Sequence, residues 1–161
     1  MIQRVYEKVA PLVDMAVVAA DDDRIYDTVV GFNGRVVMTS ADHKSGTDRV
    51  QEAYKKVSEA LGVEYDVIIN VQGDEPFIAA QQIQAVKDCF MQADTDIATL
   101  VKPFHKEDGL QALLNPNSPK VVIGKQCQAL YFSRSVIPYL RGVAQEEWLE
   151  HQTFYKHIGL Y

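Results

Sequence analysis

Residues 66–76 of this 161-residue chain read DVIINVQGDEP, and this stretch decides the fold class. Its first part, Asp66–Gln72, is a nearly continuous apolar and β-branched run, which Gly73 and Pro76 bring to an end. A run of this kind is typical of a parallel strand that is covered on both faces. We therefore predict a buried strand whose carboxyl end lies close to Gln72.

Strand and helix patterns alternate on both sides of this run. Apolar runs predict strands over 15–20 and 35–39, and helical spacing predicts helices over 2–9, 24–30, 48–61, 81–91 and 108–114. Further strands are predicted over 96–101, 120–123, 128–132 and 155–161, and their close spacing favours antiparallel pairing for part of the sheet. The alternation predicts an α/β fold with a mostly parallel mixed sheet. Since no internal repeat or linker is evident, we predict a single domain over residues 1–161.

The composition excludes several classes of protein. With 47% hydrophobic and 24% charged residues the chain is an ordinary globular one, and its net charge of −6 argues against a nucleic-acid-binding surface. No apolar run approaches the roughly 20 residues that a membrane span needs, and the start lacks the apolar core of a signal peptide. Cys89 and Cys127 have no metal-binding spacing and are expected to be reduced. We therefore expect a cytoplasmic protein without nucleic-acid or membrane partners.

A carboxylate follows the central run directly. Ligands of open α/β sheets bind beyond the carboxyl ends of the strands, which is where Gln72 and Asp74 are expected. Mg²⁺ prefers one or two carboxylates together with substrate phosphates, so Asp74 is a candidate metal ligand. The alternative is that Asp74 only caps a tight turn.

A polar loop precedes the helix predicted over 48–61. Residues 40–49 read SADHKSGTDR and bring together hydroxyls, a glycine and three potential cations at a helix start. Backbone N–H groups at a helix N-terminus suit anionic or carbonyl ligands. The alternative is an ordinary capping box on a solvated loop, with Thr47 or Asp48 as the cap.

Two further signals lie near the end of the chain. Arg134 follows the strand predicted over 128–132 and could bind a carboxylate with its planar guanidinium, or be an ordinary surface arginine. In 155–161, strict alternation puts His157, Gly159 and Tyr161 on one face of a strand. This face leaves room for a ligand, although half-exposed strands often have the same pattern.

Together, these segments resemble a known family. The stretches MTSADHKSGTDR, INVQGDEPFI, NSPKVV, ALYFSRSVIPY and HIGLY are similar to those of the Kdo (3-deoxy-manno-octulosonate) cytidylyltransferases, or CMP-Kdo synthetases, in the same order. Sialic-acid cytidylyltransferases carry a QPTSPLR-like segment after the corresponding strand, so the Gly-Asp-Glu-Pro run separates the two sister families. The resemblance implies a Rossmann-like, three-layer fold of the nucleotide-diphospho-sugar transferase type.

The resemblance also implies an activity and a set of roles. The family joins CTP and Kdo to give CMP-Kdo and pyrophosphate for lipopolysaccharide synthesis, with Mg²⁺ and usually as a homodimer. By position, Asp74 matches the catalytic metal-binding aspartate. The residues expected to bind CTP are Ser45, Gly46 and Lys44, and those expected to bind the sugar are Gln72, Arg134, His157 and Tyr161.

Members of the family also have segments that this sequence does not show. They begin with a strand and a loop of the RYxSxRxPGKPL kind that holds the triphosphate, and a second metal-binding aspartate follows their HIGLY stretch. The resemblance therefore implies that residues 1–161 are incomplete at both ends, and we expect them to be inactive by themselves. Two other hypotheses stay open: a cytidylyltransferase for another sugar acid, such as a sialic-acid relative, and a non-catalytic binding or assembly module.

Overall fold

The computed structural model describes residues 1–92 and 94–161, which fall into two compact units. Unit 1 comprises residues 1–98 together with Leu160 and Tyr161, and unit 2 comprises residues 99–159. Each unit is described by itself below. A single domain over 1–161 stays a prediction.

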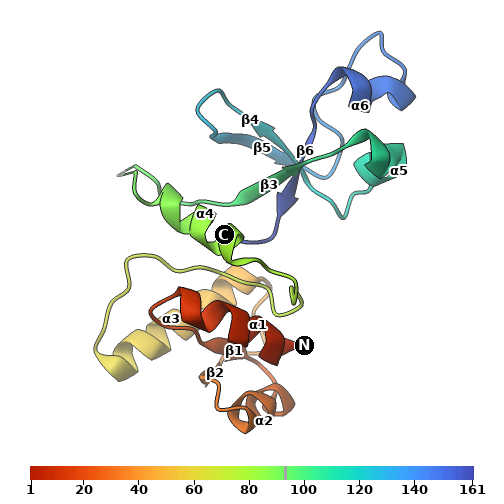
Figure 1. Ribbon diagram of the computed structural model, residues 1–161. Coiled ribbons are helices and arrows are strands. Elements are labelled where there is room, and N and C mark those ends of the chain that lie inside the picture. The colour runs from red at the N-terminus through yellow and green to blue at the C-terminus, as the bar shows by residue number, and fades with distance from the viewer. Residues whose placement is uncertain (93) are drawn as a thin grey trace. The chain divides into compact units, whose positions relative to one another are not determined.

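Unit 1 is built from helices around a short parallel sheet (Figure 1). Its strands β1 and β2 pair in parallel, with Val18 opposite Val36 and Ala20 opposite Met38. The helices are α1 (Ile2–Val9), α2 (Asp23–Gly31), α3 (Gly46–Leu61) and α4 (Ala80–Cys89), and the strands are β1 (Val18–Ala20) and β2 (Val36–Met38). The helices predicted in this part of the chain are therefore confirmed to within two residues at each end.

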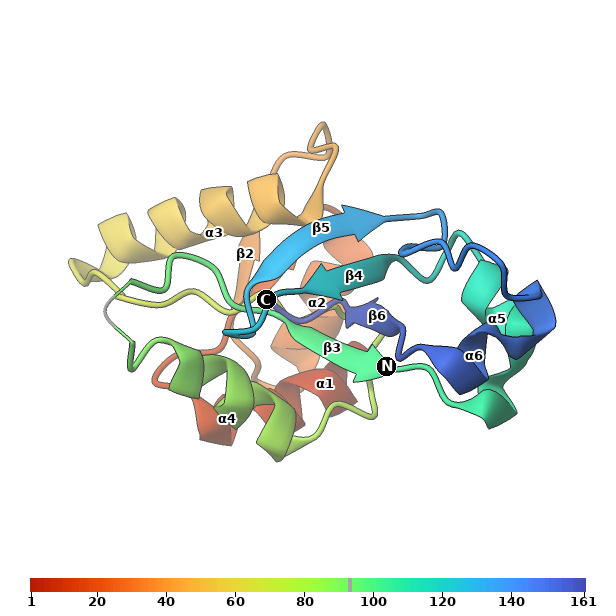
Figure 2. The same ribbon diagram turned by 90° about the horizontal axis from the view of Figure 1, so that it is seen from above.

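The helices of unit 1 form two layers. Figure 2 shows α3 on one side of β2, and α1 with α4 on the other. Apolar side chains from the four helices and from β1 are buried, and they include Val5, Ala20, Val29, Ala53, Ile83 and Val86. Burial of this apolar surface is the main force that holds the layers together.

Short polar side chains set the starts of two helices in unit 1. Asp22 caps α2, because its carboxylate accepts a hydrogen bond of 2.8 Å from the amide of Arg24. Ser45 caps α3 by accepting from the amide of Asp48 at 3.2 Å. The alternative of Thr47 or Asp48 as the cap of α3 is therefore wrong. Helix α3 starts earlier because Ser45 already has the extended backbone of a cap residue.

The segment Asp66–Gln72 is the main difference between the structure and the sequence prediction. It is not a strand, although its residues have high β propensity. A strand needs a hydrogen-bonded neighbour, and in the described residues the backbone bonds from this segment to residues outside it are those of Asn70 with Tyr161 and of Gln72 with Glu75 in the following turn. Ile68 is consequently 41% exposed. Because no neighbouring strand pairs with it, Asp66–Gln72 is an irregular extended segment despite its high β propensity.

Unit 2 is a four-stranded antiparallel sheet with two short helices (Figure 1). The strand order is β3-β6-β4-β5, and all three neighbouring pairs are antiparallel. The strands are β3 (Leu100–Pro103), β4 (Lys120–Ile123), β5 (Ala129–Ser133) and β6 (Tyr155–Ile158), and the helices are α5 (Gly109–Leu114) and α6 (Trp148–His151). Antiparallel pairing of the later strands is thus confirmed, while the strand predicted over 96–101 begins only at Leu100.

The core of unit 2 gathers at one end of its sheet. Phe104, Leu113, Trp148 and Phe154 are buried against one another. The rings of Trp148 and Phe154 are stacked with centroids 6.1 Å apart, and the indole N–H of Trp148 donates to the carbonyl of Val143 at 3.1 Å. The buried indole therefore has its polar atom satisfied.

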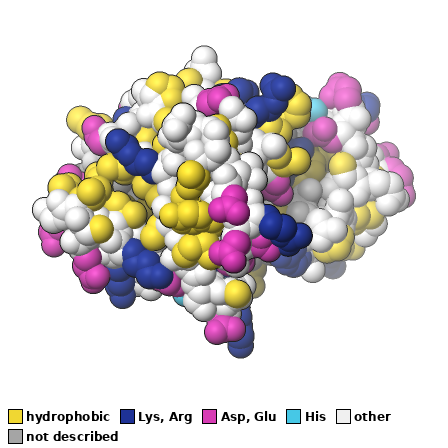
Figure 3. Space-filling model, turned by 90° about the horizontal axis from the view of Figure 1, so that it is seen from below, with side chains coloured by type: hydrophobic (Ala, Val, Ile, Leu, Met, Phe, Trp, Pro, Cys, Tyr) yellow, Lys and Arg dark blue, Asp and Glu magenta, His cyan; other side chains and the backbone are white. Residues whose placement is uncertain are grey.

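The length of the helices, the surface and the strand pairing can be described for both units. No helix in the described part of the chain is long and apolar enough to cross a membrane. On the face drawn in Figure 3, apolar side chains are interspersed with charged side chains of both signs. An α/β fold is confirmed, with parallel pairing in unit 1 and antiparallel pairing in unit 2.

Candidate functional site

The carboxyl ends of β1 and β2 are joined to α3 through Arg49. Its guanidinium contacts the carboxylate of Asp21 at 2.7 Å and the hydroxyl of Thr39 at 2.9 Å. Thr39 is itself buried and donates from its hydroxyl to the carbonyl of Ala20 at 2.9 Å. Three elements therefore meet at one point, and Arg49 neutralises the carboxylate there.

The loop before α3 is fixed by Glu52. This carboxylate accepts from the amide of Ser40 at 3.0 Å, forms an ion pair with Lys56 at 2.7 Å and contacts the imidazole of His43. The hydrogen bonds from Lys56, Ser40 and His43 lower the pKa of Glu52 from 4.5 to about 2. The loop is thus held at Ser40 and His43 by a carboxylate that stays ionised.

The three residues expected to bind CTP lie at the start of α3. Ser45 donates from its hydroxyl to the carboxylate of Asp48 at 2.7 Å while capping the helix, so its hydroxyl is committed to the helix start. Lys44 is exposed. Gly46 is the first residue of α3, and a Cβ added to it would lie 3.5 Å from the side-chain nitrogen of Asn70 and 3.8 Å from that of Gln72. The loop and the end of Asp66–Gln72 therefore approach each other at Gly46.

Asn70 is a residue whose importance sequence reasoning missed. Its side chain is buried, and its amide nitrogen is one of two buried side-chain polar atoms in the described residues without a hydrogen-bond partner, the other being the hydroxyl of Ser58. A buried donor without a partner costs about 1–3 kcal/mol, so it is usually retained for a reason. Asn70 interrupts an otherwise apolar run, and that interruption is the signal that could have identified it.

Tyr161 joins the same cluster. Its carbonyl accepts a hydrogen bond of 2.6 Å from the amide of Asn70, and its hydroxyl lies 3.1 Å from Oγ1 of Thr47. The amide nitrogen of Gln72 donates to the side-chain oxygen of Asn70 at 3.5 Å. Gly46, Asn70, Gln72 and Tyr161 therefore lie together in unit 1.

Asp74 lies in a tight turn directly after this cluster. The amide of Glu75 donates to the carbonyl of Gln72 at 3.2 Å, which leaves Gly73 and Asp74 as the central residues of the turn. The carboxylate of Asp74 is exposed and has no hydrogen bond or ion pair to any residue that the structure describes. The same part of the chain holds no group of three His, Cys, Asp or Glu side chains that could bind a metal. A single free carboxylate fits Mg²⁺ that takes its other ligands from substrate phosphates and water.

His157 lies on β6 of unit 2, between two other side chains. Its Nε2 is 2.8 Å from the hydroxyl of Thr99, and its ring meets that of Phe132 edge-on with centroids 5.3 Å apart. Burial lowers the pKa of His157, because removal from water disfavours the charged imidazolium. His157 is therefore set up as a neutral hydrogen-bonding group.

Arg134 is held beside the start of β4 in the same unit. One guanidinium nitrogen donates to the carbonyl of Pro116 at 2.9 Å, and the guanidinium is otherwise exposed. Ser133 and Lys156 both pair with Lys120, so Arg134 and His157 are the next residues at the same end of the sheet. One strand, β4, separates them.

Lys120 is a second residue that sequence reasoning did not identify as important. Its side chain is fully buried, and Nζ donates to the carbonyls of Asn115, Ser118 and Arg134 at 2.8–3.2 Å. Burial lowers the pKa of this amine. Lys120 thus fixes the backbone at Arg134 and the turn that carries Pro116. The segment NSPKVV contains this lysine, but no pattern in it predicts burial.

The comparisons with known proteins agree on one family. The family model described as cytidylyltransferase matches residues 1–161. The chain is 61% identical over 161 residues to 3-deoxy-manno-octulosonate cytidylyltransferase of Phocaeicola vulgatus and 56% identical to that of Bacteroides thetaiotaomicron. Both matches cover the whole of this chain, but 62% and 63% of the relatives, so the chain spans less than two thirds of their length.

A solved structure extends this similarity to the fold. CMP:2-keto-3-deoxy-manno-octonic acid synthetase complexed with CTP matches with a TM-score of 0.81 and 36% sequence identity. The match covers 99% of this chain and 61% of that one. The resemblance inferred from the sequence motifs and the nucleotidyltransferase-type α/β fold are thereby confirmed.

Proposed function

This chain belongs to the cytidylyltransferase family, and from that membership we propose that the whole protein transfers CMP from CTP to Kdo, giving CMP-Kdo and pyrophosphate. The names of the relatives support the choice of Kdo. The structural observation that carries the proposal is the buried, unpartnered amide of Asn70 beside Gly46. Such a donor is suited to a base that offers carbonyl and ring-nitrogen acceptors, as cytosine does.

Unit 1 would supply the groups that bind the nucleotide. The amide of Asn70 would donate to cytosine, and Gly46 leaves the space for the base because it has no side chain. Lys44 lies in the same loop and would offset negative charge on the triphosphate. The contacts of Arg49 and Glu52 keep this loop in one conformation, which reduces the ordering cost of binding.

On the metal side, Asp74 would hold Mg²⁺. When bound, the metal neutralises charge on the phosphates and on the departing pyrophosphate. The turn at Gly73–Asp74 presents the carboxylate to solvent, so Asp74 reaches a ligand without breaking an existing contact.

On the sugar side, unit 2 would supply Arg134 for the carboxylate of Kdo and His157 for a hydroxyl. In unit 1, Gln72 and Tyr161 are the residues that the family resemblance proposes for sugar hydroxyls. A guanidinium with one nitrogen anchored on Pro116 keeps its other donors for a carboxylate. A neutral His157 suits a hydroxyl, because it can donate or accept without adding charge. The reaction then needs the anomeric hydroxyl of Kdo to attack the α-phosphorus in line with the leaving pyrophosphate, and positioning is the main contribution of the protein.

The exposed edge of unit 2 supports a homodimer. Leu130 and Tyr131 on β5 are 63% and 64% exposed, and large exposed apolar side chains of this kind are typical of interfaces. We further propose that the protein works in the cytoplasm, where the nucleotide substrate is made.

The experiment that tests the function is an assay of pyrophosphate release by the whole protein with Mg²⁺. CTP, UTP, ATP and GTP are supplied in turn with Kdo, and then Kdo and N-acetylneuraminate are compared with CTP. We expect turnover with CTP and Kdo only. Preference for a purine nucleotide would contradict the family role, preference for the sialic acid would change the sugar, and binding of CTP without turnover would favour a binding module.

A further inference from the structure

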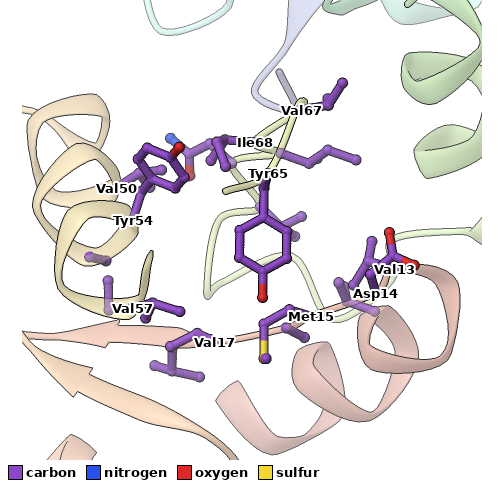
Figure 4. Close-up of a pocket in the computed structure, with 18 of the residues that line it drawn as sticks. Val13, Asp14, Met15, Val17, Val50, Tyr54, Val57, Tyr65, Val67 and Ile68 are labelled. Atoms are coloured by element: carbon purple, nitrogen blue, oxygen red, sulfur yellow. The ribbon is translucent and has the colours of Figure 1, made fainter. Parts of the chain in front are cut away.

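The residues of unit 1 that are proposed to bind the nucleotide adjoin a cavity of about 880 Å³. Figure 4 shows the ring of Tyr65 pointing into this cavity, and Gly46 and Asn70 are among the residues that line it. The cavity therefore belongs with the nucleotide residues already described. The sugar-side residues of unit 2, Arg134 and His157, are instead placed by hydrogen bonds to one turn of the chain.

Residues 115–119, between α5 and β4, are bonded to both of these sugar-side residues. The carbonyl of Pro116 accepts a hydrogen bond of 2.9 Å from the guanidinium of Arg134. The carbonyl of Pro119 accepts one of 2.8 Å from the backbone amide of His157. Arg134 follows β5 and His157 lies on β6, and these strands are the two neighbours of β4 in the sheet. We call residues 115–119 the bridging turn, because they join the two residues across β4.

Lys120, the first residue of β4, holds the bridging turn from inside unit 2. Its Nζ donates to the carbonyl of Asn115 at 2.8 Å and to that of Ser118 at 2.9 Å. The bonds within the turn are short-range: the amide of Ser118 donates to the carbonyl of Asn115 at 3.1 Å, and the amide of Asn117 donates to its side-chain oxygen at 2.9 Å. The amine of Lys120 therefore ties the turn to the buried start of β4.

The same amine also holds Arg134. Nζ of Lys120 donates to the backbone carbonyl of Arg134 at 3.2 Å. Pro116, which accepts from the guanidinium, lies between Asn115 and Ser118, the two residues of the turn that Lys120 holds. Lys120 therefore acts on Arg134 twice, on its backbone directly and on its guanidinium through the bridging turn.

The charge of Lys120 indicates a role beyond filling space. The three N–H groups of an ammonium match the three carbonyls to which Lys120 donates. In the part of the chain that the structure describes, no carboxylate forms an ion pair with this amine, and burial lowers its pKa. Burying an ammonium without a counter-ion is unfavourable, and an apolar side chain of similar size would fill the same space more easily. The bonds of this amine are therefore expected to matter for more than packing.

We propose that Lys120 is a positioning residue for the sugar acid, which fixes the direction of the Arg134 guanidinium and its spacing from His157 through the bridging turn. The inference rests on the proposed function, in which Arg134 binds the carboxylate of Kdo and His157 binds a hydroxyl. A guanidinium binds a carboxylate through two parallel hydrogen bonds, so the strength of the pair depends on the direction of the planar group. The bonds from the Lys120 amine stay within unit 2, whereas the residues proposed for the nucleotide lie in unit 1.

Steady-state kinetics of the whole protein test the proposal. Lys120→Met removes the amine, and we expect the KM for Kdo to rise about tenfold while the KM for CTP stays within about twofold. The control is Leu149→Ala on α6, whose side chain packs against the core of unit 2. This variant also destabilises unit 2, but a loss of folded protein lowers the rate without changing either KM. The ratio of the two KM values therefore separates positioning from stability.

A milder variant keeps the test valid if Lys120→Met does not fold. Asn115→Ala, on the exposed side of the bridging turn, removes the oxygen that accepts from the amide of Asn117 and leaves Lys120 in place. It should loosen the turn and raise the KM for Kdo about threefold, with the KM for CTP unchanged.

Amide hydrogen exchange gives a readout besides activity. The amide of His157 is bonded to the bridging turn, whereas the amide of Phe104 is bonded to the carbonyl of Phe154 at 2.8 Å in the core of unit 2. In Lys120→Met, exchange at His157 should become faster by about tenfold relative to exchange at Phe104. Leu149→Ala should leave this ratio unchanged.

The outcomes separate this inference from the proposed function. Equal changes in both KM values, or an unchanged KM for Kdo in Lys120→Met and Asn115→Ala, would overturn the positioning role. Exchange that becomes faster by the same factor at His157 and Phe104 would also overturn it. If the wild type did not turn over CTP with Kdo, the proposed function would fail and the sugar role of Lys120 with it.

Discussion

The amide nitrogen of Asn70 lies 2.6 Å from the carbonyl oxygen of Tyr161, so a residue of the central apolar run pairs with one from the far end of the sequence. The same asparagine holds a buried amide nitrogen that has no hydrogen-bond partner among the described residues. The backbone of Asn70 is therefore fixed while its side chain keeps a donor for a ligand. This division is what makes the cluster in unit 1 a candidate nucleotide site.

The first prediction concerns the space beside this amide. Gly46→Ala adds a methyl group 3.5 Å from the side-chain nitrogen of Asn70, an ordinary contact, so the fold should be kept. The methyl group takes the space proposed for cytosine, and CTP affinity should fall about tenfold, which is roughly 1.4 kcal/mol. Calorimetric titration and thermal unfolding measure the two effects. Gly31→Ala is the control, because a Cβ at Gly31 meets nothing within 4 Å; equal CTP binding by both variants would remove Gly46 from the site.

The second prediction concerns the metal. Asp74→Asn in the whole protein should reduce turnover by at least a hundredfold, because lost stabilisation of transition-state charge costs several kcal/mol. The fold should survive, since the carboxylate is exposed and unpaired in the described structure. Turnover at increasing Mg²⁺ and circular dichroism check both points. Asp66→Asn, at the start of the extended segment that precedes the turn, is the control. Near-normal turnover of Asp74→Asn would mean that Asp74 only forms the turn.

The third prediction separates the two substrates. Arg134→Lys keeps the positive charge but loses the planar pair of donors, so the KM for Kdo should rise about tenfold while the KM for CTP changes little. Steady-state kinetics of the whole protein with each substrate varied in turn measure the difference. Arg141→Lys is a matched change on an exposed loop of unit 2. If both KM values rose equally, the bond from Arg134 to Pro116 would be structural rather than a support for sugar binding.

The fourth prediction concerns acid stability. The pKa of Glu52 is about 2 in the folded chain against an ordinary 4.5, so its ionised form stabilises the fold. This contribution is complete above about pH 4.5 and is lost as the pH falls toward 2. The stability difference between the wild type and Glu52→Gln should therefore shrink over this interval in urea unfolding at stepped pH. Glu59→Gln on the same helix is the control and should change the curve much less; a constant difference for Glu52→Gln would contradict the role of its charge.

The fifth prediction concerns Lys120. Lys120→Met keeps most of the side-chain volume but removes the amine to which three partly buried carbonyls are bonded, so unit 2 should lose about 1–3 kcal/mol of stability. Fluorescence of Trp148, whose ring is part of the core of unit 2, reports the unfolding of this unit. Lys125→Met, on the exposed turn after β4, should have an effect below about 0.5 kcal/mol. Unchanged stability of Lys120→Met would show that other donors replace the amine.

The sequence predicted helices α1 to α5 closely because each has a local signal, but it did not predict the single-turn helix α6. The apolar spacing of α1 to α5 depends only on neighbouring residues, so their ends were predicted to within two residues. Strands depend on partners that the sequence does not name. Asp66–Gln72 has the residue types of a strand, but in the described chain its backbone is paired with a distant segment only at Asn70, which is too little to form a strand.

The candidate site was predicted only in part, because burial, like strand pairing, depends on residues that are distant in the sequence. Ser45, Gly46, Gln72 and Tyr161 were recognised from motifs, and the structure brings their segments together in unit 1. Asn70 and Lys120 were missed because their roles depend on burial. An asparagine in an apolar run and a lysine at a strand start have no local pattern that shows whether their polar atoms will find partners.

The environment of Lys120 has a chemical consequence. Acylating reagents attack a lysine only through the lone pair of its free amine, and the nitrogen must also be accessible to them. The amine of Lys120 is fully buried and donates to three carbonyls, so a reagent reaches it only when unit 2 opens. Acetylation of this lysine would therefore record how often unit 2 unfolds, and peptide mass spectrometry could read it against exposed lysines such as Lys125 in the same sample.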